Sequence, residues 1–303
     1  MPDPIVCTPK SLPRSQLVKA AATASEINPV NHPPLHQLST VLPGFTPTKE
    51  FIAVLTTKYW HAKGVRLTMG FLDNPPADLR AHIIAHMNAW SSRLNVSFTE
   101  SNTEAKVRIA RTEGSGYWSY LGTDILSIAS DEATMNLEAF TMDTPESEFI
   151  RVVRHETGHT LGCPHEHMRR ELVERIDPDK AIEYFGLTQG WTPDQVRQQV
   201  LTPLEDSSLI GTSHSDPNSI MCYQIPGTIT KDGKPILGGT DIDPSDFDFM
   251  SGIYPKPDQM TVSAGPVSPP SQITTPTELS ATLARAQQER DVLKKALAIM
   301  VRE

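Results

Sequence analysis

The sequence predicts an α+β fold in which a strand-rich first lobe and a loop-rich second lobe flank a histidine-rich helical segment. Three observations support this prediction. Short apolar and alternating segments dominate the first part of the chain, a histidine-rich helical segment follows near residue 155, and long polar loops separate short helices after it. At 303 residues the chain is long enough to bury a large core as one two-lobed domain with appendages.

We expect four parts along the chain. Residues 1–48 form a proline-rich N-terminal arm, a possible pro-segment, with room for one short helix near residues 15–25. Residues 49–256 form the main domain. Residues 257–275 are a linker rich in Pro, Ser and Thr, and residues 276–303 form a C-terminal helix.

The C-terminal helix leaves two arrangements open. A capping box at 275–278 starts it, and apolar residues recur every seven positions over fewer than four heptads. A helix packed on its own domain and a coiled coil that joins chains into a homo-oligomer both fit this pattern.

In the first lobe, apolar and alternating segments predict strands at 51–55, 65–71, 96–99 and 106–110. Residues 114–122, bounded by glycines and rich in aromatic residues, are expected to form an exposed edge strand. A helix follows Pro75-Pro76, and its apolar residues recur at helical spacing and face a core: Leu79, Ile83, Met87, Trp90 and Leu94.

The metal-binding helix is expected from about Pro145 to Leu161. Thr144 offers a capping hydroxyl, proline occupies the first helical position, and Glu146 suits the positive end of the helix. Short helices of the second lobe are expected to begin at three later caps, namely Asp177, Thr192 and Asp243.

The metal-binding prediction rests on the segment HETGHTLGCPH, from His155 to His165. On a helix, His155 and His159 lie one turn apart on the same face, which is the spacing at which two imidazoles can share one tetrahedral metal ion. Glycine readily adopts the left-handed conformation, so Gly162 lets the chain turn and bring His165 back as a third ligand. Three protein ligands leave one position for water, as in catalytic zinc sites.

Glu156 follows the first of these histidines, and we expect it to act as a general base. Its carboxylate can reach a metal-bound water without occupying a coordination position. The shorter pattern His-Glu-x-x-His also occurs by chance in helices that bind no metal. The third histidine and the glycine make coincidence a poor explanation of the longer pattern.

Charge and apolar patterns exclude several classes of partner. The formal net charge of −9 and the pI near 5.6 argue against a nucleic-acid partner, and no basic run suggests an anionic membrane. No apolar stretch reaches membrane-spanning length. The N-terminus has no recognisable secretory signal, and the three cysteines argue against a disulfide scaffold. We therefore expect a cytoplasmic location, or export without a signal peptide.

A second motif, Ser219-Ile220-Met221-Cys222-Tyr223, stands downstream of the histidines. Together the two motifs resemble those of the metzincin peptidases, and among them the astacin family. The family's edge-strand pattern Gly-x-Trp-Ser-x-x-Gly is matched by residues 116–122. The resemblance covers roughly residues 51–254. It implies a metzincin-type zincin fold with a zinc cleft between the two lobes, and it makes residues 49–256 an astacin-like catalytic domain.

This resemblance implies a zinc-dependent endopeptidase that acts on a peptide or protein substrate. One zinc ion per chain would be bound by His155, His159 and His165, with Glu156 as the general base. The base would take a proton from the attacking water and return it to the leaving amine.

The resemblance also implies roles around the zinc. Met221 would form an apolar floor beneath the ligands, and Tyr223 would be a mobile fifth ligand that hydrogen-bonds the oxyanion. The edge strand would hold an extended substrate by backbone pairing. Candidate substrate contacts on that strand are Trp118, Ser119 and Tyr120.

The chain departs from the family at several positions. Tyr117 stands where the family has a half-cystine, Cys222 replaces the usual histidine of the methionine turn, and the family's latency aspartate has no match. Cys7 is the only soft donor in the arm, and its thiolate is a candidate latency ligand for the zinc. We prefer to interpret Cys7 as a structural thiol.

His82 and His86 are also four residues apart on a predicted helix, next to its apolar stripe. Because the sequence offers no third ligand beside them, we interpret them as core or rim histidines.

Other functions remain open beside the endopeptidase. One is a catalytically silent or latent zincin-fold binding module, against which the presence of Glu156 argues. Another is a metal-dependent amide hydrolase on a non-peptide substrate, against which the edge strand argues. A third is an assembly component that acts chiefly through the C-terminal helix.

Overall fold

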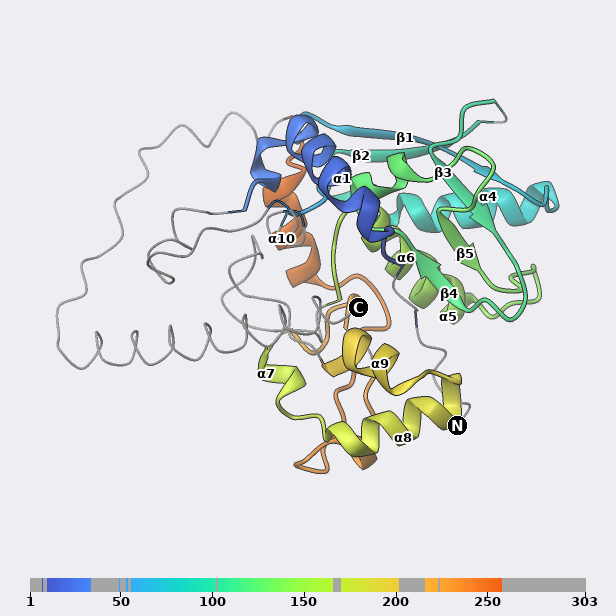
Figure 1. Cartoon of the computed structure of the whole chain (residues 1–303). Coiled ribbons are helices and arrows are strands. Elements are labelled where there is room, and N and C mark those ends of the chain that lie inside the picture. Colours follow the sequence, from blue (N-terminus) through green and yellow to red (C-terminus); the bar gives the residue numbers. More distant parts are fainter. Residues whose placement is uncertain are drawn as a thin grey trace.

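The structure is a computed structural model that describes residues 7, 10–33, 49, 53, 56–101, 103–165, 170–201, 216–222 and 224–257. The sheet and its helices form one lobe, helices α8 (Pro178–Gln189) and α9 (Pro193–Val196) belong to the other, and α6 (Arg154–Thr160) lies between them (Figure 1). The strand predicted at 51–55 lies mostly outside the described residues, and its one described residue, Ala53, is helical, so the prediction is wrong at that position. The linker and the C-terminal helix also lie mostly or wholly outside the described residues.

The first lobe contains a mixed sheet of five strands in the order β2-β1-β3-β5-β4. β4 pairs antiparallel with β5, and the other neighbours are parallel. The strands are β1 (Val65–Phe71), β2 (Val96–Glu100), β3 (Val107–Ala110), β4 (Tyr117–Ser119) and β5 (Met135–Leu137). The predictions at 65–71, 96–99 and 106–110 are confirmed, whereas β5, which is three residues long, was not predicted.

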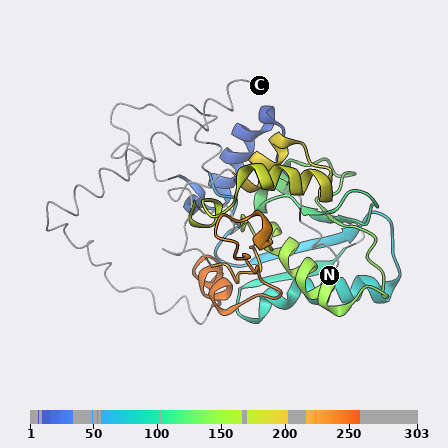
Figure 2. The same cartoon turned by 90° about the horizontal axis from the view of Figure 1, so that it is seen from below.

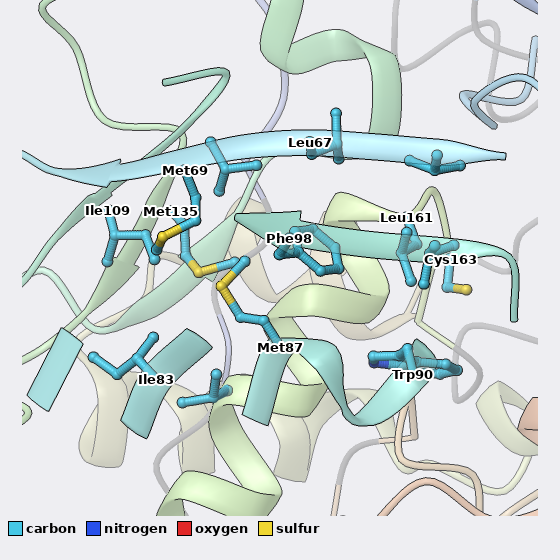
Figure 3. Packing of buried hydrophobic residues seen from close by; sticks show 14 of the residues in the cluster. Leu67, Met69, Ile83, Met87, Trp90, Phe98, Ile109, Met135, Leu161 and Cys163 are labelled. Atoms are coloured by element: carbon cyan, nitrogen blue, oxygen red, sulfur yellow. The ribbon is translucent and has the colours of Figure 1, made fainter. Parts of the chain in front are cut away.

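Helix α4 (Ala77–Met87) covers one face of the sheet and continues into a 3₁₀ turn at Asn88–Ser92. Ile83 and Met87 point from α4 toward the strands, and Phe98 and Met135 lie opposite them (Figure 3). All four side chains are almost fully buried, which confirms the predicted apolar stripe. The nearby Trp90 donates its indole N–H to the carbonyl of Arg154 over 2.9 Å, so the first-lobe core is joined directly to α6.

Part of the N-terminal arm lies on the main domain. Helix α1 (Arg14–Ile27) and α4 lie on opposite sides of the strands (Figure 2). A 3₁₀ turn at Pro29–Asn31 follows α1, and Asn31 anchors it: the side chain donates to the carbonyl of Tyr59 over 2.7 Å and accepts from its N–H over 2.9 Å. The short helix expected near residues 15–25 is therefore confirmed, and it is docked.

The segment that leads into α6 is helical but not uniform. α5 (Glu146–Glu148) is followed by a π-helical turn at Phe149–Val153 and then by α6. The predicted capping role of Thr144 is wrong. The N-cap is Pro145, which has no side-chain oxygen, and the hydroxyl of Thr144 instead accepts the N–H of Thr141 over 3.0 Å in the preceding turn.

The second lobe consists of short helices joined by loops. The three predicted caps are confirmed: Asp177 accepts from the first turn of α8, and Thr192 and Asp243 form capping boxes. The other elements are α7 (Arg170–Val173), a π turn (Arg197–Leu201), a 3₁₀ turn (Gly227–Ile229) and α10 (Pro244–Ile253). Among the described residues, no helix is both long and apolar enough to cross a membrane.

Tyr254, just after α10, ties three parts of the chain together. Its buried hydroxyl accepts the backbone N–H of Trp60 over 2.9 Å and donates to the carbonyl of Leu161 over 2.6 Å. Burial raises the pKa of this hydroxyl well above its ordinary value, so it remains protonated and can donate. The end of the metal-binding helix is thereby held against the start of the first lobe.

We expect Tyr254→Phe to lower the free energy of unfolding by about 2–4 kcal/mol, because it leaves a buried N–H and a buried carbonyl without their partner. Denaturant unfolding of the purified chain measures this change. The matched control is Tyr120→Phe, since Tyr120 is half-buried and its hydroxyl makes no hydrogen bond with the described residues. Equal losses for the two variants would contradict the role given to the Tyr254 hydroxyl.

Candidate active site

The helix α6 and the turn after it bring the three predicted zinc ligands together. The rings of His155 and His159 are 4.8 Å apart at their centroids and perpendicular. Gly162 has a φ of +102°, and a Cβ there would lie 2.9 Å from the ring of Tyr59. The turn therefore requires glycine both for its backbone conformation and for its packing. It returns His165 to the ring of His159, with centroids 4.4 Å apart.

The Nε2 atoms of the three rings converge on one point. The Nε2 atom of His165 lies 3.2 Å from that of His155 and 3.0 Å from that of His159. Around a tetrahedral zinc ion with Zn–N bonds of about 2.0–2.1 Å, two ligand atoms are about 3.3 Å apart. The three side chains are at least nine-tenths buried, so no ligand atom depends on solvent for its position.

Backbone carbonyls fix which ring nitrogens face this point. The Nδ1 atom of His155 is 2.6 Å from the carbonyl oxygen of Ile220, and that of His159 is 2.7 Å from the carbonyl oxygen of Cys163. A carbonyl only accepts, so each Nδ1 carries the proton and each Nε2 presents a lone pair. Burial lowers the pKa of His159 to about 4, which keeps that ring neutral. Lone pairs held about 3 Å apart fit a shared cation and would repel one another without it.

Glu156 lies at the same site and is 1 % exposed. Burial raises the pKa of its carboxyl group to about 8. A divalent cation among the neighbouring imidazoles favours the charged carboxylate and opposes this shift. The carboxyl oxygen Oε2 accepts a hydrogen bond from the Cys7 thiol, with a sulfur–oxygen distance of 3.5 Å.

The Cys7 thiol itself belongs to the cluster of possible metal ligands. One ligand atom each from Cys7, His155, His159 and His165 lies within 4.8 Å of the other three, and all four residues are buried. The sequence marked Cys7 as the only soft donor of the arm, and we preferred a structural role for it. Its place beside the three imidazoles instead favours the candidate role as a latency ligand.

The methionine turn packs against the middle of α6. A Cβ on Gly158 would lie closer to the sulfur of Met221 than real Cβ atoms come to any neighbour, so Met221 fills the space beside Gly158, between the two helical histidines. Tyr223, the predicted fifth ligand, lies outside the described residues.

Asp246 holds this turn in place, a role that the sequence did not indicate beyond its part in a capping box. The carboxylate accepts the hydroxyl of Ser219 over 2.6 Å and the N–H of Ile220 over 3.0 Å. Burial raises the pKa of Asp246 to about 6, which is still below neutral pH. The two hydrogen bonds offset the cost of burying the carboxylate charge. Asp246 therefore positions the carbonyl of Ile220 that orients His155.

The candidate substrate strand β4 lies beside α6. The hydroxyl of Ser119 is 3.0 Å from that of Thr160, and Trp118 is 9 % exposed. The prediction of an edge strand within residues 114–122 is confirmed, because β4 is the last strand of the sheet, although it spans only Tyr117–Ser119. The prediction that this strand is exposed is wrong: all three residues of β4 are buried, and Tyr120 beyond it is half-buried.

The N-terminal arm covers this edge, which explains the burial. Cys7 forms a parallel bridge with Tyr117, and Lys10 forms another with Tyr120. The ammonium group of Lys10 also lies 4.9 Å from the centre of the Trp118 ring. The backbone at Cys7 and at Lys10 therefore occupies the position in which β4 would pair with a peptide.

We expect Asp246→Ala to raise the dissociation constant for zinc about 10- to 100-fold, because the carbonyl that orients His155 loses its support. Zinc binding to the refolded apo chain, measured by competition with a chelating dye, tests this. Asp248→Ala is the matched control on the same helix, since its side chain is 80 % exposed. An unchanged zinc affinity in folded Asp246→Ala would contradict the positioning role.

Comparisons with known proteins agree with this geometry. The family model of astacin, which describes a family of peptidases, matches residues 54–231, more than half of the chain. Among solved structures, one of myroilysin superposes with a TM-score of 0.62 at 29 % identity, covering 66 % of this chain and 96 % of that chain. A second structure of myroilysin gives a TM-score of 0.52 at 30 % identity, covering 66 % and 86 %.

A curated relative, the zinc metalloproteinase nas-27 of Caenorhabditis elegans, is 26 % identical over 125 residues, which is 41 % of this chain. The matched part spans 27 % of the worm protein, about a quarter of its length. The family match includes β1 to β5, the histidine segment and the first residues after the methionine turn. On these grounds the chain belongs to the astacin family of zinc metallopeptidases.

Proposed function

We propose that the chain is a zinc-dependent endopeptidase that hydrolyses peptide bonds in peptides or proteins. The observation that carries the proposal is the convergence of three imidazole Nε2 atoms, 3.0–3.2 Å apart, beside the buried carboxyl group of Glu156. Membership of the astacin family supports the same activity. Zinc bound by the three imidazoles supplies a Lewis acid that polarises a carbonyl and lowers the pKa of a water to about 7.

Residues of the chain itself transfer the proton and orient the zinc ligands. Glu156 takes the proton from the attacking water and delivers it to the leaving amine. The carbonyls of Ile220 and Cys163 hold His155 and His159 in the tautomer that presents Nε2. The burial of all these groups excludes bulk water, which strengthens each electrostatic interaction at the site.

The edge strand β4 supports a peptide rather than a small amide as the substrate. A backbone segment already pairs with Tyr117 and Tyr120, so this edge accepts an extended chain. The hydroxyl of Ser119 faces α6, which puts such a chain next to the zinc ligands. Backbone pairing along an edge strand is a common mode of peptide recognition.

The described conformation also supports a latent state of this enzyme. Cys7 places its thiol among the imidazoles and donates to Glu156, so it competes both for the open zinc position and for the base. The bridges of Cys7 and Lys10 block the substrate edge at the same time. We infer that the arm inhibits the enzyme and that its displacement opens the site. A silent binding module is disfavoured, because Glu156 is present at the site.

Replacing Glu156 tests the catalytic proposal. In a chain already freed of the thiol by Cys7→Ala, we expect Glu156→Gln to lower kcat/KM for a fluorogenic peptide by about 10²- to 10⁴-fold, the range attributed to general base catalysis. Zinc content should remain one ion at this site, because Glu156 is not a proposed ligand. The control is Glu174→Gln, an exposed carboxylate of the second lobe, which should keep the parent's rate. A Glu156→Gln chain that binds zinc and cuts as fast as its parent would refute the mechanism.

Replacing Cys7 tests latency. We expect Cys7→Ala to raise peptide cleavage by about tenfold or more, since loss of an inhibitory interaction of about 1.4 kcal/mol is enough for that change. Cys7→Ser, which keeps the size but is a poorer zinc ligand, should give an intermediate rate. As a second readout, mass spectrometry should find the Cys7 thiol protected from alkylation until zinc is chelated. Alkylation that is equally fast with and without zinc would count against a thiol at the metal.

A further inference from the structure

A second cluster of metal-ligating groups lies outside the active site. His82 and His86 are one turn apart on α4, and Glu146 is the first residue of α5. The Nε2 atom of His82 is 2.8 Å from Glu146 Oε2, and that of His86 is 3.2 Å from Glu146 Oε1. One ligand atom from each of the three residues lies within 4.8 Å of the other two. We interpreted the two histidines as core or rim residues because no third ligand stands near them in the sequence. The fold brings Glu146 to them as that third ligand.

The two rings of this cluster repeat the arrangement of the histidines on α6. The centroids of His82 and His86 are 4.8 Å apart with an interplanar angle of 79°, compared with 4.8 Å and 90° for His155 and His159. The same four-residue spacing on a helix thus gives nearly the same pair of donors. Two histidines with one carboxylate form a ligand set that binds zinc in other proteins.

Phe149 fixes the orientation of both rings. It lies edge-on to His82 at 4.5 Å and is stacked on His86 at 5.6 Å between centroids. Since Phe149 itself is 1 % exposed, the two imidazoles rest on a side chain that is part of the core. Little conformational freedom of His86 is then lost when an ion binds, which favours affinity.

The charges at the cluster also suit a cation. The side chain of His86 is buried, which favours the neutral ring, the form that binds metals. Glu146 supplies a carboxylate that both imidazoles contact. The guanidinium group of Arg154 opposes a positive charge on His86. This guanidinium is itself paired with Asp241, with a nitrogen–oxygen distance of 2.6 Å. The Nδ1 atom of His86 is buried and makes no hydrogen bond with the described residues.

The cluster is open to solvent on one side. The side chain of Glu146 is 60 % exposed and that of His82 is 31 % exposed, whereas that of His86 is 6 % exposed. An ion can therefore enter from solvent and keep water in its remaining positions. Because α5 leads through the π turn into α6, an ion here would join α4 to the helix that carries the catalytic groups.

We propose that His82, His86 and Glu146 form a second binding site for a divalent ion of the zinc class, and that the ion stabilises the junction between α4 and the catalytic helix. The site contributes no ligand to the active site and takes no part in peptide hydrolysis. Its affinity is lower than that of the buried three-histidine site, because Glu146 is exposed and His82 is partly exposed to water.

The test is the zinc content of the full chain after dialysis against buffered zinc, measured by elemental analysis. We expect His82→Ala and Glu146→Gln each to bind one ion fewer per chain than the parent. The matched control is His61→Ala, which removes an exposed histidine away from the cluster and should retain the parent's zinc content. Once the buried three-histidine site is filled, further zinc should also raise the thermal midpoint of the parent and of the control, and should fail to do so for the two cluster variants.

The outcomes separate this site from the catalytic one. If His82→Ala and Glu146→Gln bind as many ions as the parent and are stabilised equally by zinc, the proposal is wrong. Loss of an ion from His61→Ala as well would indicate nonspecific binding to surface histidines and would also overturn it. His155→Ala should lose the ion of the active site and keep the ion at His82, so failure at either site is visible by itself. Circular dichroism of each variant checks that the exposed substitutions leave the fold intact.

Discussion

The active site depends on two short hydrogen bonds from imidazole Nδ1 atoms to backbone carbonyls. They set the tautomers of His155 and His159 and direct both Nε2 lone pairs to one point. The accepting carbonyls belong to different parts of the chain, the turn after α6 and the methionine turn. Correct assembly of the metal site therefore requires the second lobe to be folded against α6, and Asp246 is the group that connects the methionine turn to α10.

The same α6 helix is supported from the other side by the first lobe. Trp90 binds a carbonyl at the start of the helix and the hydroxyl of Tyr254 binds one just past its end, so both ends are fixed by buried donors. Such support lets the site keep several groups that would be costly alone, among them a fully buried carboxyl group and three buried imidazoles. The arm adds a further restraint, because Cys7 and Lys10 connect the edge of the sheet with the metal centre.

Much of this architecture could be predicted from local sequence patterns. The strand at 65–71, the caps at Asp177, Thr192 and Asp243, and the glycine of the histidine segment all follow from interactions between near neighbours in the chain. What was missed depends on residues distant in sequence. Asp246 and Ser219 are 27 residues apart, His82 and Glu146 are 64 apart, and Cys7 and Glu156 are 149 apart. No periodicity reports such contacts. β5 was missed for a different reason, since a strand of three residues is too short to show alternation.

The π-helical turn at Phe149–Val153 stands between Glu146 of the second cluster and His155 of the active site on one continuous helical path. In a regular α-helix each residue turns the chain by about 100°, so inserting or removing one residue changes the direction of everything beyond it by that amount. The wider π turn therefore sets the angle between the side chains before it and those after it. Phe149 can face α4 while His155 faces the other zinc ligands. Changes of length here should be far less acceptable in evolution than in the surrounding loops, because a single deleted residue would misalign two sites at once.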